Sequence, residues 1–252
     1  MQNIAIIIQA RLGSTRLSNK MILPFWNGKS IFELLLSKLN ENFENIPIIL
    51  ATSTNSENDI LESIAKKNGL LVFRGDENDV LQRFISACDF FKIKHCIRVC
   101  ADNPFLDVKE LKNILDFAEN NTSFDYINFN VNNIPSIKTH FGFWTEYVTL
   151  AALKKVNTLT KEKLYHEHVT NYIYENPEKF QIYFLSPNMN VIGRTDIRMT
   201  LDTIVDFQVL SELYGILSEK YVDFGIDEII SFLDNNSQYS TIMNVQMKNN
   251  VK

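Results

Sequence analysis

Glycine and proline are scarce in the 252-residue sequence, with 8 and 6 residues respectively. No stretch rich in Gly, Ser or Pro interrupts the chain, and no internal repeat is present. Because such stretches typically separate domains, we expect one domain over residues 1–235. The polar segment 236–252 is expected to be a C-terminal tail that frays.

Two common nucleotide-binding motifs are also missing. No GxGxxG follows the first apolar run, which excludes a dinucleotide-binding Rossmann domain by its fingerprint. Gly28-Lys29-Ser30 matches the end of a Walker A motif, but Leu23 stands where the leading glycine is needed. No strand immediately precedes this segment either, so the sequence argues against a P-loop.

An excess of positive charge, paired cysteines and long apolar runs are absent as well. The formal net charge is −5 and no Lys/Arg cluster is visible, which argues against a nucleic-acid partner. The three cysteines, Cys88, Cys96 and Cys100, form no CxxC pair and indicate reduced thiols in the cytoplasm. No stretch approaches the roughly 20 apolar residues of a membrane span and no signal peptide is evident, so we expect no membrane partner.

The sequence does contain short apolar runs that alternate with amphipathic segments. Four strand-then-helix units in about 120 residues predict an α/β fold with a parallel sheet covered by helices on both faces. Capping boxes are predicted at Ser30/Glu33 and Thr203/Asp206. The predicted strands are 4–8, 46–51, 70–73, 96–100, 126–129, 180–185 and 197–201, and the predicted helices are 31–39, 60–68, 80–91, 108–119, 147–155, 161–174, 204–217 and 225–233.

A loop with three cations follows the first apolar run. Arg11, Arg16 and Lys20 lie there beside the small residues Gly13 and Ser14. Backbone N–H groups can reach phosphate oxygens past small side chains, and the cations neutralise charge, so the loop suits a nucleoside triphosphate. A solvated loop with incidental arginines fits the composition of this segment equally well.

Two carboxylates each follow a predicted strand. Asp102 comes after 96–100 and Asp202 after 197–201. If both strands run in the same direction in one sheet, the two acids meet at its carboxyl edge, where open α/β sheets bind ligands. Mg²⁺ typically takes one or two carboxylates plus substrate phosphates. Helix capping, or an Asx-turn for Asp102, is the alternative role.

The residues of the cationic loop resemble a known family. The segment QARLGSTRL at 9–17, followed by Lys20, resembles the N-terminal signature of the cytidylyltransferases that activate acidic sugars. These include the acylneuraminate and 3-deoxy-manno-octulosonate enzymes. Within that family the chain resembles the spore-coat-polysaccharide-type branch. The likeness continues through ATS at 51–53, RG at 74–75, DVLQR at 79–83, ADNP at 101–104, EHVT at 167–170 and LDT at 201–203. One departure is Ser18-Asn19, where the family often has Pro-Gly.

The resemblance implies a three-layer nucleotide-diphospho-sugar transferase fold, of the glycosyltransferase-A type, with a mixed, mostly parallel sheet. It implies that CTP and an acidic sugar give a CMP-sugar and pyrophosphate for surface-glycan biosynthesis, with Mg²⁺ as cofactor. Arg11, Arg16 and Lys20 would hold the triphosphate, and Asp102 and Asp202 the metal. Further nucleotide contacts are expected from Ala10, Leu12, Gly13, Ser14, Thr52, Arg74 and Ala101.

Contacts to the acceptor are predicted from Arg83, Asn103, His166 and His168. Arg83 could bind a substrate carboxylate through two parallel hydrogen bonds, or form a surface ion pair. His166 and His168 would point about 200° apart on a helix, which argues against a shared zinc ion. We expect one of them to face the site and the other to lie at the surface, although two ordinary helix histidines fit the pattern too.

The segment 134–147 is rich in aromatic residues. Phe141, Phe143, Trp144 and Tyr147 predict an excursion that packs on a second copy of the chain, which would give a homodimer. A lid over the site or part of the core are the alternatives.

Two other functions remain to be separated from cytidylyl transfer. A glycosyltransferase of the same broad fold would be expected to carry a DxD motif at the end of the fourth strand, where this chain has Asp102-Asn103-Pro104. A non-catalytic nucleotide-binding module would need no pair of metal-binding acids. A nucleotidyltransferase that uses another triphosphate or a non-sugar acceptor also stays open.

Overall fold

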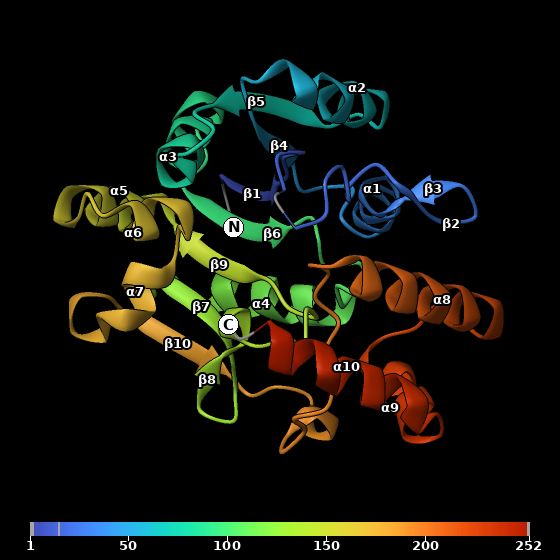
Figure 1. Ribbon diagram of the computed structural model, residues 1–252. Helices are drawn as coiled ribbons and strands as arrows, with labels where there is room; N and C mark the ends of the chain where they lie inside the picture. The colour runs from blue at the N-terminus through green and yellow to red at the C-terminus, as the bar shows by residue number, and fades with distance from the viewer. Residues whose placement is uncertain (1–2, 15, 251–252) are drawn as a thin grey trace.

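A mixed sheet runs through the middle of the computed structural model, which describes residues 3–14 and 16–250 (Figure 1). The strand order is β10-β7-β9-β6-β1-β4-β5, and β8 pairs with β7. Along this path only β9 runs antiparallel to its neighbours, which confirms the predicted mixed, mostly parallel sheet. The strands are β1 (Ile4–Gln9), β4 (Ile48–Ser53), β5 (Leu71–Gly75), β6 (His95–Cys100), β7 (Tyr126–Val131), β8 (Ile134–Pro135), β9 (Glu146–Thr149) and β10 (Ile182–Leu185), while β2 (Pro24–Trp26) and β3 (Lys29–Ser30) form a separate pair.

Helices cover both faces of the sheet. Alternate residues of β1 enter different cores, because neighbouring side chains of a strand point to opposite faces. One core includes α1 (Ile31–Asn42), α2 (Asp59–Lys67), α4 (Val108–Asn120), α8 (Ile204–Lys220), α9 (Ile226–Asp234) and α10 (Ser237–Asn249). The other includes α3 (Val80–Phe91), α5 (Leu150–Leu159) and α7 (Asn171–Glu175), and α6 (Lys163–Glu167) packs on α3. Short 3-10 helices are η1 (Ser56–Asn58), η2 (Ser136–Lys138), η3 (Pro177–Lys179) and η4 (Met189–Val191).

Both predicted capping boxes are confirmed. Ser30 accepts a hydrogen bond from the Glu33 backbone at the start of α1, and the Glu33 carboxylate accepts one from the Ser30 backbone. Thr203 and Asp206 do the same at the start of α8. A side-chain cap of this kind stabilises a helix by about 1 kcal/mol. The second box fixes the chain directly after Asp202.

Three predicted elements are wrong. Residues 197–201 are buried but form no strand, so Asp202 does not follow a strand of the sheet. Residues 147–149 belong to the antiparallel strand β9 rather than to a helix. The predicted helix 161–174 is two short helices, α6 and α7, because the backbone leaves helical geometry at His168.

The C-terminal segment also differs from its prediction. Residues 237–249 form α10 instead of a frayed tail, and Tyr239 and Met243 of this helix are buried. Its polar composition hid this packing, because a narrow apolar stripe suffices for a helix that covers other helices. Among the described residues, no helix is both long and apolar enough to cross a membrane.

The aromatic side chains of segment 134–147 are part of the core. Phe141, Phe143, Trp144 and Tyr147 are all buried within the chain itself. Phe129 stacks on Trp144. Phe141 and Phe143 pack edge-on against the Trp144 ring, at interplanar angles of 73° and 83°. The prediction that these aromatics contact a second copy is therefore wrong, because their surface is already covered. The homodimer itself stays a prediction without this support.

Candidate active site

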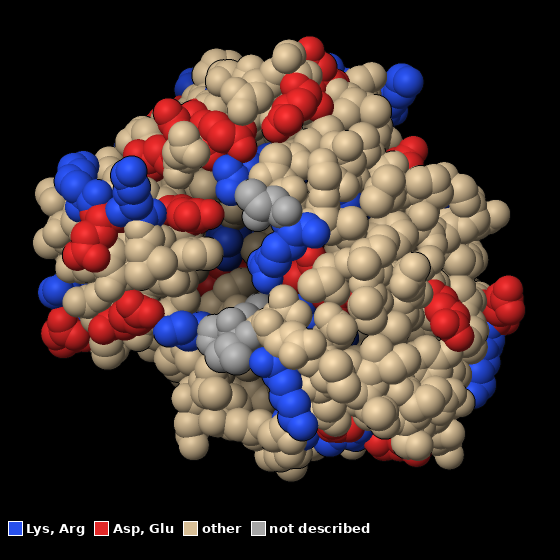
Figure 2. Space-filling model, in the orientation of Figure 1, with Lys and Arg blue, Asp and Glu red and all other residues tan. Residues whose placement is uncertain are grey.

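Two cavities lie at the carboxyl edge of the sheet, beside the ends of β1 and β6. The loop cavity, of about 360 Å³, is bordered mainly by the loop after β1. The sheet cavity, of about 450 Å³, extends between that loop, segment 136–144 and α7. Arg16, Cys100 and Asp102 line both, so the two cavities meet at the end of β6. Figure 2 shows a hollow near the centre of this face, bordered by Lys and Arg side chains.

The loop after β1 is held in place by buried contacts at Leu12. The Leu12 side chain is buried, and its backbone N–H donates to Asn58 Oδ1 over 2.9 Å. The Ser14 N–H returns to the Leu12 carbonyl oxygen at 2.7 Å, which makes a tight turn. A methyl group at Gly13 would lie 3.2 Å from a Glu57 carboxylate oxygen and 3.3 Å from one of Glu77. This turn places the small residues Gly13 and Ser14 at the border of the loop cavity.

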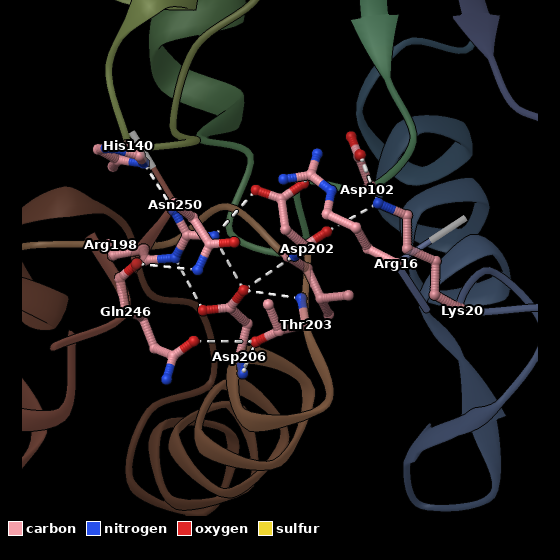
Figure 3. A network of polar contacts seen from close by, with 11 residues as sticks. Arg16, Lys20, Asp102, His140, Arg198, Asp202, Thr203, Asp206, Gln246 and Asn250 are labelled. Atoms are coloured by element: carbon pink, nitrogen blue, oxygen red, sulfur yellow. Dashed lines mark hydrogen bonds and ion pairs between the residues drawn. The ribbon is translucent and has the colours of Figure 1, made fainter. Parts of the chain in front are cut away.

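Lys20 is buried and joins the two predicted metal-binding regions. Its Nζ donates to Asp102 Oδ2 at 2.8 Å and to the Leu201 carbonyl oxygen at 2.7 Å (Figure 3). Leu201 directly precedes Asp202 in the sequence. Asp102 and Asp202, which are far apart in the sequence, are therefore brought to the same edge of the sheet, as predicted. Only Asp102 directly follows a strand.

Asp202 lies between two arginines. Arg16 contacts its Oδ1 at 2.8 Å, and the buried Arg198 donates to its Oδ2 at 2.9 Å. Arg198 also binds both oxygens of Asp206, at 2.7 and 2.9 Å. Burial opposes the charge of Arg198, but Asp206 and Asp202 raise its pKa above the ordinary value. Burial would raise the pKa of Asp206, but Arg198 and the N–H groups of Thr203 and Asp202 hold it below the usual range.

Arg11 is also paired with acids. Its Nη1 lies 2.9 Å from Glu77 Oε1, and its Nη2 lies 3.6 Å from Glu167 Oε1. All three predicted phosphate-binding cations are thus neutralised by carboxylates of this chain. A polyanionic ligand that enters the loop cavity can exchange places with these carboxylates.

A buried charge pair includes Arg98, which lines the sheet cavity. Arg98 on β6 binds Glu146 on β9, and its Nε and Nη2 donate to Gln9 Oε1 at 3.2 and 3.0 Å. Glu146 also accepts hydrogen bonds from the hydroxyls of Tyr126 and Thr170. Burial disfavours a charged Arg98, but Cys100 and Glu146 raise its pKa, so its guanidinium remains charged.

The two histidines have different environments. His168 lines the sheet cavity, and burial lowers its pKa, which favours a neutral imidazole at pH 7. His166 is buried, with Nδ1 2.8 Å from Asp79 Oδ2 and Nε2 3.1 Å from the Thr160 carbonyl oxygen. The prediction that one histidine faces the site agrees with His168. His166 is neither at the surface nor at the cavity, because it joins α6 to the cap of α3.

The carboxylates of this edge fit a metal that is shared with a ligand. Asp102 supplies hard oxygen ligands beside both cavities, and Asp202 supplies them beside the sheet cavity. Among residues 3–14 and 16–250, no group of three or more His, Cys, Asp or Glu side chains could hold a metal ion. A Mg²⁺ ion here would therefore need further oxygens from bound phosphate or water, as it commonly does in nucleotide sites.

The structure brings most predicted site residues to the two cavities. The predicted residues that line one or both are Ala10, Arg11, Gly13, Ser14, Arg16, Lys20, Asp102, Asn103, His168 and Asp202. The side chains of Leu12, Thr52 and Ala101 are buried and line neither cavity, so nucleotide contacts by these three residues stay predictions.

Two predicted arginines lie away from the cavities. Arg74 donates to the Ser53 and Asn55 carbonyls and forms ion pairs with Asp59 and Glu62, so it joins β5 to α2. Arg83 is buried, and its Nη1 donates to the carbonyls of two residues in the loop before α3. Burial lowers the pKa of Arg83 to about 10. In this structure each guanidinium holds a loop of the protein, and substrate contacts by Arg74 and Arg83 stay predictions.

Most residues that line the sheet cavity were not predicted from the sequence. Its other lining residues come from separated parts of the chain: Arg98, Ser136, Ile137, Lys138, Thr139, Gly142, Trp144, Asn171, Tyr174, Thr200 and Asn250. No local pattern marks these positions as a site. One available signal was Arg98, a charged residue inside an otherwise apolar strand, since buried charges need partners.

Comparisons with known proteins identify relatives over nearly the full chain. A family model described as Cytidylyltransferase matches residues 5–245. "Uncharacterized protein MJ1063" of Methanocaldococcus jannaschii is 38% identical over 243 residues, covering 96% of this chain and 95% of that protein. "Spore coat polysaccharide biosynthesis protein SpsF" of Bacillus subtilis is 31% identical over 246 residues, covering 96% and 98%. A solved cytidylyltransferase structure from Leptospira borgpetersenii gives a TM-score of 0.81 at 30% identity, covering 95% and 97%.

Proposed function

The chain belongs to the cytidylyltransferase family, and from this membership we propose that it transfers CMP from CTP to an acidic sugar. The products would be a CMP-sugar and pyrophosphate, used to build a surface polysaccharide. The relative from Bacillus subtilis is a spore coat polysaccharide biosynthesis protein, which supports this use of the product.

The observation that carries the proposal is the junction of the two cavities at Arg16 and Asp102. CTP in the loop cavity and an acceptor in the sheet cavity would meet there. A bond would form between an acceptor oxygen and the α-phosphorus while the bond to pyrophosphate breaks. Holding both reactants in position at this junction accounts for much of the rate enhancement in such a transfer.

We assign the triphosphate to Arg11, Arg16 and Lys20. Each cation now contacts a carboxylate, and a triphosphate offers each of them a stronger, multiply charged partner. Charge builds up on the leaving pyrophosphate during the transfer, so fixed cations there stabilise the transition state.

Asp102 and Asp202 would hold Mg²⁺ together with the phosphates. When bound, the ion would supply charge neutralisation and polarise a phosphoryl oxygen. The residues of this chain keep both carboxylates in place: Lys20 orients Asp102, and Arg198 orients Asp202.

The preference for an acidic acceptor rests on the cations of the sheet cavity. Arg98, Lys138 and Arg16 line this cavity, and Arg16 also lines the loop cavity. A carboxylate on the acceptor would gain charge-assisted hydrogen bonds from such groups. A neutral sugar of the same shape would not gain these charge-assisted hydrogen bonds.

Pyrophosphate release from CTP and Mg²⁺ tests this proposal with matched pairs of acceptors. Each ulosonic acid of a panel is compared with its own carboxamide, which keeps the ring and hydroxyls but loses the charge. We expect release with at least one acid and at least about tenfold lower kcat/KM with its amide, in line with loss of an ionic hydrogen bond. Equal rates for acid and amide, or release with neither, would overturn the acidic-sugar assignment.

A further inference from the structure

We propose that the C-terminal end of α10 is a wall of the acceptor site and determines which acceptors fit. This inference rests on the proposed function, because it takes the sheet cavity as the place of the acceptor. Asn250, the residue directly after α10, lines that cavity together with Asp202 and Thr200. Figure 3 shows Asn250 on the same side of the network as Arg198 and Asp202. The loop cavity contains no residue of α10 among those that border it in the described chain. A change at Asn250 should therefore act on the acceptor and not on CTP.

The helix is fixed to the body of the protein. Tyr239 and Met243 are buried in the core beside α8. The Tyr239 hydroxyl donates to Glu212 of α8 at 2.8 Å, and the Met243 sulfur accepts the Arg198 N–H at 3.4 Å. Arg198 in turn binds Asp202. The wall that α10 forms is thus placed by packing next to the proposed metal-binding carboxylate.

The last turns of α10 continue this connection to the cavity. Thr203, the cap of α8 and the neighbour of Asp202, donates its hydroxyl hydrogen bond to Gln246 Oε1 at 3.1 Å. The Asn250 side chain donates to the Gln246 carbonyl oxygen at 2.9 Å. Asn250 is therefore held at the cavity by its own helix, and its amide offers polar atoms on a fixed support.

A pair of neighbouring substitutions tests the inference. Asn250→Phe adds bulk at the cavity, whereas Asn249→Phe adds the same bulk at an exposed position of the same helix. With the best acidic sugar of the panel, we expect Asn250→Phe to raise the acceptor KM about tenfold or more. The Kd for CTP and Mg²⁺ should change less than about twofold, and Asn249→Phe should match the unmodified chain. An unchanged acceptor KM in Asn250→Phe, or an equal loss of CTP binding, would overturn the inference.

A second measurement needs no acceptor. Cys100 lines both cavities and is partly exposed, whereas Cys88 and Cys96 are buried. With CTP saturating the loop cavity, iodoacetamide must reach Cys100 through the sheet cavity. We expect Asn250→Phe to slow alkylation at Cys100 about fivefold or more, and Asn249→Phe to leave it unchanged. Mass spectrometry of the labelled peptide gives the rate.

The two measurements separate the failure of this inference from that of the proposed function. If no acidic sugar supports pyrophosphate release by the unmodified chain, the proposed function fails, and the alkylation rates alone decide whether α10 forms a wall of the cavity. Should Asn250→Phe lower the melting temperature, Asn250→Ala gives the reverse test: faster alkylation and weaker selectivity between acceptors of different size. Equal alkylation rates in all variants would contradict the inference.

Discussion

The Lys20 ammonium donates to Asp102 Oδ2 at 2.8 Å while it also holds the carbonyl oxygen before Asp202 at 2.7 Å. One side chain therefore connects the loop after β1, the end of β6 and the entry to α8. These segments are far apart in the sequence, and their meeting point is also the junction of the two cavities.

Lys20→Met is expected to lower kcat/KM for CTP by about a hundredfold or more, since it removes a charge that stabilises the leaving pyrophosphate. Methionine keeps the apolar stem that packs beside the loop. Lys29→Met, at an exposed position of β3, serves as the control and should leave kcat/KM unchanged. Normal turnover of CTP by Lys20→Met would show that this lysine only orients Asp102.

Arg11→Gln and Arg74→Gln are matched substitutions that separate a phosphate contact from a structural arginine. Arg11 lines the loop cavity, whereas Arg74 is occupied by β4 and α2. Arg11→Gln should weaken CTP binding about tenfold or more, the loss of one charge-assisted hydrogen bond. Arg74→Gln should leave the Kd for CTP within about twofold. Calorimetric titration with CTP and Mg²⁺ measures both, and a larger loss in Arg74→Gln would support the predicted nucleotide contact of that residue.

Asp202→Asn is expected to lose the Mg²⁺-dependent activity while the fold is retained. The amide cannot replace the carboxylate as a ligand for a hard cation. Arg198 keeps both contacts to Asp206, so the buried guanidinium remains paired. We expect only a small decrease in melting temperature. A large decrease together with normal activity would assign Asp202 to capping and packing instead.

Asp206→Asn, in contrast to Asp202→Asn, should clearly lower the stability of the fold. The size of this loss should depend on pH. Arg198 and two backbone N–H groups hold the pKa of Asp206 below its unfolded value although burial opposes this. The folded protein therefore binds fewer protons, so this contribution is complete above the unfolded pKa of about 4 and is lost as pH falls through the lower, folded pKa. Breaking a buried pair costs on the order of 3 kcal/mol.

Urea unfolding from pH 7 to pH 3 measures this contribution. Asp206→Asn should be less stable than the unmodified chain at pH 7, and the gap should narrow below about pH 4. Asp234→Asn is the control, because Asp234 pairs with Arg194 at an exposed position and should cost less than about 1 kcal/mol. A gap that is the same at every pH would mean that the ion pair of Asp206 does not stabilise the fold.

Much of the fold and part of the site could be predicted, because the signals are local. The apolar runs of β1, β4 and β6 and the caps of α1 and α8 are confirmed. The cationic loop follows β1 and Asp102 follows β6, so the order of the chain places both at the carboxyl edge of the sheet. Asp202 reaches the same edge without a strand before it.

The rest depends on contacts between distant segments. Tyr147 lies in a strand because β9 is inserted between β6 and β7. All four residues of β9 are buried, so the segment shows no alternation that would reveal a strand. Arg83 and Arg74 sit in segments that resemble motifs of the family. Arg83 donates to carbonyls of the loop before α3, and Arg74 contacts carbonyls and acids between β4 and α2. Asn250 reaches the cavity only through the packing of α10 on α8.

The molecule that receives the CMP group of CTP decides whether this chain is a sugar-activating cytidylyltransferase. Incubation of the unmodified chain with CTP, Mg²⁺ and an acidic sugar, followed by mass spectrometry and a pyrophosphate assay, answers this. We predict one equivalent of pyrophosphate for each CMP-sugar formed and little release when the sugar is omitted. Pyrophosphate formed at the same rate without the sugar, with free CMP as the nucleotide product, would contradict the account.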